Sequence, residues 1–172
     1  MTELPDKRRD YVNDKRPVSF VLREAGFVPD FERVTSCAAV AFNAEGKLVT
    51  AYEHGGPDFP GGHVRIDEDT PEQTVRRESL EEAGILVSEP KHVRAIEVRP
   101  EGAQPEEFTY MLIMTAMVTG YGEMLPGSQR AEMTVEEFKA TYLGLDAAMT
   151  ATLIDEAFAI NFPSETLLFK EN

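Results

Sequence analysis

The feature that most constrains this 172-residue chain is segment 70–84, which carries the start and stop signals of a helix. Thr70 can cap the first turn, Pro71 suits the first helical position, and Gln73 completes a capping box with Thr70. Gly84 can adopt the left-handed conformation that ends a helix. The sequence therefore predicts a helix between Thr70 and Gly84.

One face of this predicted helix is acidic. At 100° per residue, Glu78, Glu81 and Glu82 fall within an arc of about 100°. Like charges at this spacing destabilise a helix mildly, and a hard divalent cation removes their repulsion. Oxygen ligands suit Mg²⁺ or Mn²⁺ better than Zn²⁺. Arg77 can hold a carboxylate by a charge-assisted hydrogen bond, so we expect a metal site on this face.

A glycine pair, Gly61 and Gly62, precedes the helix and allows the backbone to approach a ligand or ion closely. Carboxylates, a divalent cation and a glycine loop together suggest phosphate chemistry, in which the metal neutralises phosphoryl oxygens and activates water. The alternative is an acidic face that is merely solvated. Chance occurrence of R-E-x-x-E-E-x-G at this composition has a probability on the order of 0.001, which favours the metal site.

Segment 61–85 resembles the signature box of the Nudix hydrolases: glycine, five residues, glutamate, seven residues, then R-E-U-x-E-E-x-G-U, where U is apolar. The resemblance implies an α/β/α sandwich, and Mg²⁺-dependent (or Mn²⁺-dependent) cleavage of a diphosphate linkage in a nucleoside diphosphate derivative. It also implies that Glu81 and Glu82 bind the metal together with the Gly61 carbonyl. Glu78 would be a metal ligand or general base, oriented by Arg77.

Three departures from the box stand out. One extra residue separates Gly62 from Arg77, so the first acidic position of the box falls on either Glu68 or Asp69. We expect Asp69, because it directly precedes the threonine and proline that start the helix. The other departures are Arg65, where the family usually has glutamate, and Ser79, where an apolar residue is usual.

The rest of the chain predicts a mixed sheet with helices on both faces, an α/β (α+β) fold in a single domain. We expect strands at 34–42, 47–53, 92–98 and 107–118, the last of them central, and helices at 134–143 and 146–160. Residues 55–62 are too rich in glycine and proline for regular structure. Segment 18–27 reads as a short helix or strand within an N-terminal extension, 1–33. The Nudix-like domain would then be 34–172.

Composition excludes several classes of protein. The net charge of −14 argues against a nucleic-acid partner, since phosphate backbones are bound by clusters of lysine and arginine. The single cysteine, Cys37, allows no intramolecular disulfide. The sequence contains neither a signal peptide nor an apolar run of about 18–20 residues, so we expect a cytoplasmic protein without a membrane contact. A homodimer is compatible with the sequence.

The expected partner is a small molecule of the nucleotide type. Candidate substrate-binding residues outside the acidic core are Gly62, His63, Phe59 and Glu132. Pro100 lies where family members that act on ADP-ribose tend to have a proline, so ADP-ribose-like compounds and nucleoside triphosphates are the leading substrates. Two rivals remain: a Nudix-fold module that senses nucleotides without turnover, and a plain cation-binding protein.

Overall fold

The computed structural model describes residues 15–53 and 55–165. Its sheet is mixed, because β2 and β8 run parallel whereas the other strand pairs are antiparallel. In spatial order the main path consists of β1 (Val18–Leu22), β7 (Lys91–Pro100), β8 (Thr109–Tyr121), β2 (Val34–Phe42), β3 (Leu48–Glu53) and β4 (Gly56–Asp58). Off this path, β5 (Gly61–His63) pairs with β2, β6 (Ile85–Val87) with β8, and β9 (Arg130–Met133) with β3.

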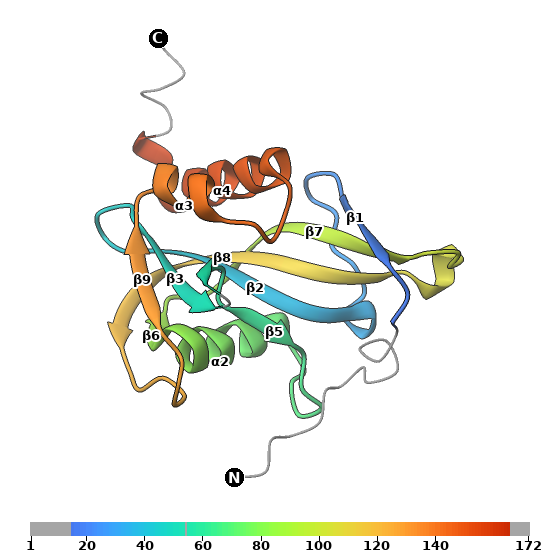
Figure 1. Cartoon of the computed structure of the whole chain (residues 1–172), viewed down its shortest axis with the longest axis horizontal. Coiled ribbons are helices and arrows are strands. Elements are labelled where there is room, and N and C mark those ends of the chain that lie inside the picture. The colour runs from blue at the N-terminus through green and yellow to red at the C-terminus, as the bar shows by residue number, and fades with distance from the viewer. Residues whose placement is uncertain (1–14, 54, 166–172) are drawn as a thin grey trace.

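Helices cover both faces of this sheet (Figure 1). Helix α2 (Pro71–Ala83) lies on one face, and α3 (Val135–Thr141) and α4 (Ala147–Asn161) lie on the other. Two short 3₁₀ helices, Phe31–Arg33 and Pro105–Glu107, lie between strands. The α/β/α sandwich and the central position of β8 are therefore as predicted.

The helix signals in the sequence act as expected. Thr70 caps α2 in a full capping box with Gln73. Thr134 caps α3 in the same way, and the Asp146 side chain accepts from the backbone N–H of Met149 at the start of α4. Ser79 faces the sheet and is fully buried, and its hydroxyl has no hydrogen-bond partner among the described residues.

Two expectations about local structure need correction or completion. The prediction that residues 55–62 lack regular structure is wrong, because β4 lies within this segment and β5 begins in it. Gly61 pairs there with Ala38, and a side chain at Gly61 would come within 2.6 Å of the Ala38 Cβ, so only glycine allows this approach. Of the two readings left open for segment 18–27, the strand is correct: β1 is hydrogen-bonded to β7, while residues 1–14 of the predicted extension lie outside the described part.

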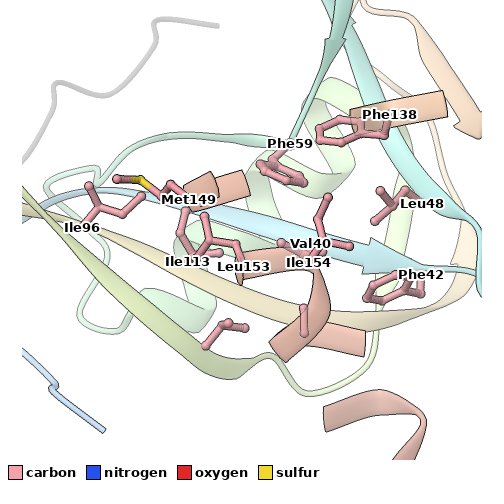
Figure 2. Packing of buried hydrophobic residues seen from close by; sticks show 12 residues of the cluster. Val40, Phe42, Leu48, Phe59, Ile96, Ile113, Phe138, Met149, Leu153 and Ile154 are labelled. Carbon is pink, nitrogen blue, oxygen red and sulfur yellow. The ribbon is translucent and has the colours of Figure 1, made fainter. Parts of the chain in front are cut away.

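The largest core cluster lies between the sheet and α4 (Figure 2). Val40 and Ile113 from the two parallel strands face Leu153 and Ile154 of α4, and all four side chains are buried. Each such side chain contributes about 1.5–3 kcal/mol on burial. Phe59 extends this core by packing on Phe138 with ring centroids 4.7 Å apart. No helix in the described part of the chain is long and apolar enough to span a bilayer.

The C-terminal end of α2 is tied to the loop that follows β8. Gly84 has φ 60° and ψ 34°, and its carbonyl accepts the N–H of Gly122 at 2.9 Å. The carbonyl of Glu81 accepts the N–H of Leu125 at 2.9 Å, and Arg130 donates to the Ala83 carbonyl at 3.1 Å. These bonds satisfy carbonyls that have no partner within the helix, and so fix the end that carries the acidic face.

Gly84→Ala should destabilise the fold by about 2 kcal/mol, which lowers the melting temperature by roughly 4–8 °C. A side chain at this position has a left-handed backbone and would also meet Met124 Cγ and the Gly122 carbonyl. Urea unfolding measures the change. Gly127→Ala is the matched control: its φ is 88° with nothing within 4 Å, so it should cost only about 1 kcal/mol. Equal costs for the two variants would contradict the proposed packing.

Candidate metal and phosphate site

The acidic face of α2 meets the glycines of β5. The chain brings them together because residues 61–63 pair with the first half of β2 while α2 packs across both strands. Gly62 faces Glu78 so closely that any Cβ at position 62 would overlap the Glu78 carboxylate. The Gly61 N–H donates to Glu82 Oε2 at 2.9 Å. Two of the three predicted carboxylate ligands, Glu78 and Glu82, therefore lie against the glycine pair.

Arg77 lies at the centre of the site, with a side chain only 16% exposed. Its guanidinium pairs with Glu78, donates to Glu81 Oε2 at 3.2 Å, and reaches the His63 carbonyl at 2.9 Å. Burial alone would lower the pKa of Arg77, but the adjacent carboxylates of Glu68 and Glu78 raise it above its ordinary value. Arg77 is therefore a permanent cation that fixes several acids at once, as its predicted orienting role requires.

Glu68, and not Asp69, fills the first acidic position of the box. Glu68 is buried and accepts hydrogen bonds from Arg77 Nε at 2.5 Å, from the Thr74 hydroxyl at 2.7 Å, and from the Arg65 backbone N–H at 2.8 Å. Burial opposes ionisation, but these bonds outweigh it and lower the pKa of Glu68. The expectation that favoured Asp69 is wrong.

The extra residue is accommodated in the turn before α2. Asp69 is exposed, and its backbone N–H donates to Gln73 Oε1 at 2.6 Å. The same oxygen accepts the Thr70 N–H at 3.1 Å. The Gln73 side chain thus accepts from two backbone donors. Despite the longer turn, Glu68 stays within hydrogen-bond distance of Arg77.

The two carboxylates nearest the glycines hold their protons more tightly than an ordinary glutamate. Burial raises the pKa of Glu78, which is 7% exposed, against the opposing effect of Arg77. Burial likewise raises the pKa of Glu82 to about 8, with the Gly61 N–H opposing and the charges of Glu78, Glu53 and Asp58 adding to the rise. In their ionised forms, the four glutamates of the site would carry more negative charge than its two arginines, Arg65 and Arg77, neutralise.

This charge excess fits a hard divalent cation. Glu78, Glu81 and Glu82 supply oxygen donors on one helix face, and a bound cation would relieve the repulsion among them. In the arrangement adopted by residues 15–53 and 55–165, no three His, Cys, Asp or Glu side chains converge as a ready ligand set. In this arrangement Arg77 and Arg65 pair with Glu78 and Glu81, and so engage oxygens that a metal would use.

A cavity of about 300 Å³ opens beside the glycine pair. Four predicted residues line it: Phe59, Gly61, Gly62 and His63. Phe59 is only 5% exposed and belongs mainly to the core. The described lining contains neither lysine nor arginine, and its carboxylate is that of Asp58.

Several lining residues were not anticipated from the sequence, namely Phe20 on β1, Met111 and Ile113 on β8, and Tyr142 and Leu145 between α3 and α4. They come from segments far apart in the chain, so no local motif marks them. Burial raises the pKa of Tyr142, and its contact with Asp58 raises it further. The Tyr142 hydroxyl therefore stays protonated and donates to the Asp58 carboxylate.

Glu132 is not brought to this cavity. It lies on β9 opposite Val49 and accepts a hydrogen bond from the Tyr121 hydroxyl at 2.8 Å. It lines a separate cavity of about 330 Å³ with residues 43–45 and 118–121. A substrate contact by Glu132 stays a prediction without support from its position.

Glu68→Gln should destabilise the fold by about 2 kcal/mol at pH 7, because charge-assisted bonds to Arg77 are weakened in a buried place. The folded-state pKa of Glu68 lies below its ordinary value of 4.5, so its stabilising effect is complete above that pH and is lost as pH falls through the folded pKa. Urea unfolding from pH 7 to pH 3.5 should therefore show the gap between wild type and variant narrowing below about pH 4.5.

Asp69→Asn is the matched control for this prediction. Its side chain is exposed, so the free energy of unfolding should change by less than about 0.5 kcal/mol. If Asp69→Asn lowered the free energy of unfolding more than Glu68→Gln does, Asp69 would be the first acid of the box.

Comparisons with known proteins bear on the family and the fold. The family model of the NUDIX domain matches residues 32–157. The pyrophosphohydrolase BsRppH of Bacillus subtilis has a similar structure, with a TM-score of 0.61 and 17% identity over 94% of this chain and 99% of that chain. No curated protein matches the sequence.

Two other solved structures share the fold. A NUDIX hydrolase from Nitrosomonas europaea gives a TM-score of 0.53 and 18% identity over 73% of this chain and 89% of that chain. The NUDIX domain of Shewanella oneidensis NrtR, complexed with ADP ribose, gives a TM-score of 0.55 and 16% identity over 73% of this chain and 86% of that chain. Because the family model covers most of the chain, this chain belongs to the Nudix hydrolase family.

Proposed function

We propose that the protein is a Mg²⁺- or Mn²⁺-dependent hydrolase that cleaves the diphosphate linkage of a nucleoside diphosphate derivative. The observation that carries this proposal is the contact of Glu78 and Glu82 with the glycine strand, next to Glu81 on the same helix and beside a cavity of about 300 Å³. A structural helix has no need of this crowding, which costs stability in the absence of a cation.

The residues of the site suit the steps of such a reaction. A divalent cation, when bound, neutralises phosphoryl oxygens and activates water. Arg77 holds Glu78 and Glu81 in position, and the Gly61 N–H holds Glu82. Glu78, with its raised pKa, is placed to accept the proton of water whose oxygen bonds to phosphorus as the P–O bond of the linkage breaks. In this proposal the Gly61 carbonyl completes the metal ligands.

The cavity beside the glycines suits the nucleoside end of the substrate. Its described lining contains neither lysine nor arginine and is largely apolar, so it suits a neutral ring better than a phosphate. Asp58 can accept hydrogen bonds from donor groups on that ring. The phosphates would then lie over α2, where Arg65, Arg77 and the metal provide positive charge.

ADP-ribose-like compounds lead the list of substrates, and nucleoside triphosphates follow. The NrtR domain with a similar fold is complexed with ADP ribose, which supports a ligand of this class. Pro100 adds little, because it ends β7 and lines a different cavity with Pro17 and Phe108. The second candidate function is binding of such a nucleotide without turnover, and the bound ADP ribose in the NrtR structure supports the binding step that this function shares with the first. A cytoplasmic location and a homodimer stay predictions.

The decisive experiment is a phosphatase-coupled phosphate-release screen of nucleotide sugars, dinucleoside polyphosphates and nucleoside triphosphates, with and without Mg²⁺. Thermal melts run in parallel, since a ligand at 100 times its dissociation constant stabilises the fold by about 2.7 kcal/mol. Metal-dependent turnover of one compound class supports the enzyme. A ligand-dependent melting shift without turnover supports the sensor module.

Glu82→Gln should lower kcat roughly 100-fold or more and leave the circular dichroism spectrum unchanged, because a metal-binding carboxylate is lost. Glu89→Gln is the matched control: its side chain is 75% exposed and pairs with Arg76 away from the site. Turnover by Glu82→Gln close to that of Glu89→Gln would contradict the assignment of the metal ligands.

Phe20→Ala should raise KM roughly tenfold for the substrate found in the screen, with little change in kcat, because an aromatic wall of the cavity is removed. Val18→Ala tests the same strand: Val18 is 44% exposed against 41% for Phe20, and it does not line this cavity. Steady-state kinetics measure both. If both variants kept the wild-type KM, the nucleoside would not bind in this cavity.

A further inference from the structure

The Arg65 side chain crosses from the loop after β5 to α2 and forms a two-pronged ion pair with Glu81. The Nη1–Oε1 distance is 3.1 Å and the Nη2–Oε2 distance is 3.3 Å. The two side chains are only 17% and 21% exposed, so the pair is screened less than a surface pair. The backbone N–H of Arg65 is fixed separately, by its bond to Glu68.

Both oxygens of Glu81 are thus engaged by guanidinium groups. Arg77 also donates to Glu81 Oε2, at 3.2 Å. Its guanidinium is held in place by further bonds to Glu68, Glu78 and the His63 carbonyl. Arg65 lies on the loop after β5, whereas Arg77 lies on α2. A cation that uses Glu81 would therefore compete with the Arg65 guanidinium for these oxygens.

We propose that Arg65 occupies Glu81 until a divalent cation binds, and that the released guanidinium then contacts a phosphate of the substrate. This inference rests on the metal site of the proposed function. A hard divalent cation offers Glu81 a stronger partner than a guanidinium does, and its arrival leaves Arg65 beside the place where the phosphates lie. The planar fork of arginine matches two phosphate oxygens as well as it matches the two oxygens of a carboxylate.

A purely structural role of Arg65 makes different predictions. If the ion pair only fastened the loop to α2, its loss would loosen the site and leave metal affinity unchanged or lower. If Arg65 competes with the metal, its loss must raise metal affinity while it lowers affinity for a diphosphate. The two effects have opposite signs, and a loosened fold does not produce that combination.

The first arm of the test measures Mn²⁺ affinity by electron paramagnetic resonance, which counts free Mn²⁺ and needs no turnover. Arg65→Gln should bind Mn²⁺ roughly five- to tenfold more tightly than wild type. Arg65→Lys, which keeps the charge but loses the fork, should also bind more tightly than wild type. Unchanged or weaker binding in either variant would overturn the competition.

Arg76→Gln is the matched control on the same helix. Arg76 pairs with Glu89 and the Val87 carbonyl, away from the acidic face, so its removal should leave Mn²⁺ affinity within about twofold of wild type. If Arg76→Gln raised Mn²⁺ affinity as much as Arg65→Gln does, the loss of one positive charge anywhere on the protein would explain both effects. That result would overturn the proposal.

The second arm uses methylenediphosphonate, a diphosphate mimic without a nucleoside, at saturating Mn²⁺. It should raise the melting temperature of wild type and of Arg76→Gln, and raise that of Arg65→Gln by less than half as much. Equal shifts in all three proteins would overturn the contact with phosphate.

Failure of this inference is separable from failure of the proposed function. Wild type that binds no Mn²⁺, or Glu82→Gln that binds it as wild type does, would remove the metal site and with it both proposals. Wild type that binds Mn²⁺ with the same affinity as Arg65→Gln would overturn the role of Arg65 alone.

Discussion

The guanidinium of Arg77 connects the three parts from which the site is built. It bonds to Glu68 in the loop, to Glu78 and Glu81 on α2, and to the His63 carbonyl at the end of β5. These groups come from three different parts of the chain: the loop before α2, α2 itself and β5. Without a buried cation at this point, the loop, the helix and the strand would present several carboxylates to one another with nothing to hold them at a fixed spacing.

The remainder of the fold supplies rigidity to this point of contact. The parallel pair β2 and β8 forms the buried centre, and α4 covers it with Leu153 and Ile154. On the opposite face, α2 is fixed at both ends, by the Thr70 capping box and by the bonds of its last carbonyls to the loop after β8. A rigid sheet and a helix fixed at both ends can hold like-charged groups close together, because such groups would otherwise move apart.

The sequence predicted what depends on local chemistry. Helix α2 followed from Thr70, Gln73 and Gly84, because caps are read within a few residues. The prediction of Asp69 was wrong because the turn before α2 is one residue longer than the box allows. The distance from the glycine pair and the distance from the helix start therefore indicate different residues, and only the first indicates Glu68. The cavity residues Phe20 and Tyr142 could not be found, since they are 122 residues apart and meet only through the order of the strands.

The longer turn before α2 bears on how relatives of this chain are recognised. Gln73 accepts the N–H groups of both Asp69 and Thr70, so the chain gains a residue there without disturbing the helix or the acids on it. A sequence pattern with fixed spacing across this turn would reject the protein, although the groups that such a pattern is meant to detect are all present. Searches that allow one insertion between the first acid of the box and the helix cap should therefore recover members that strict patterns discard.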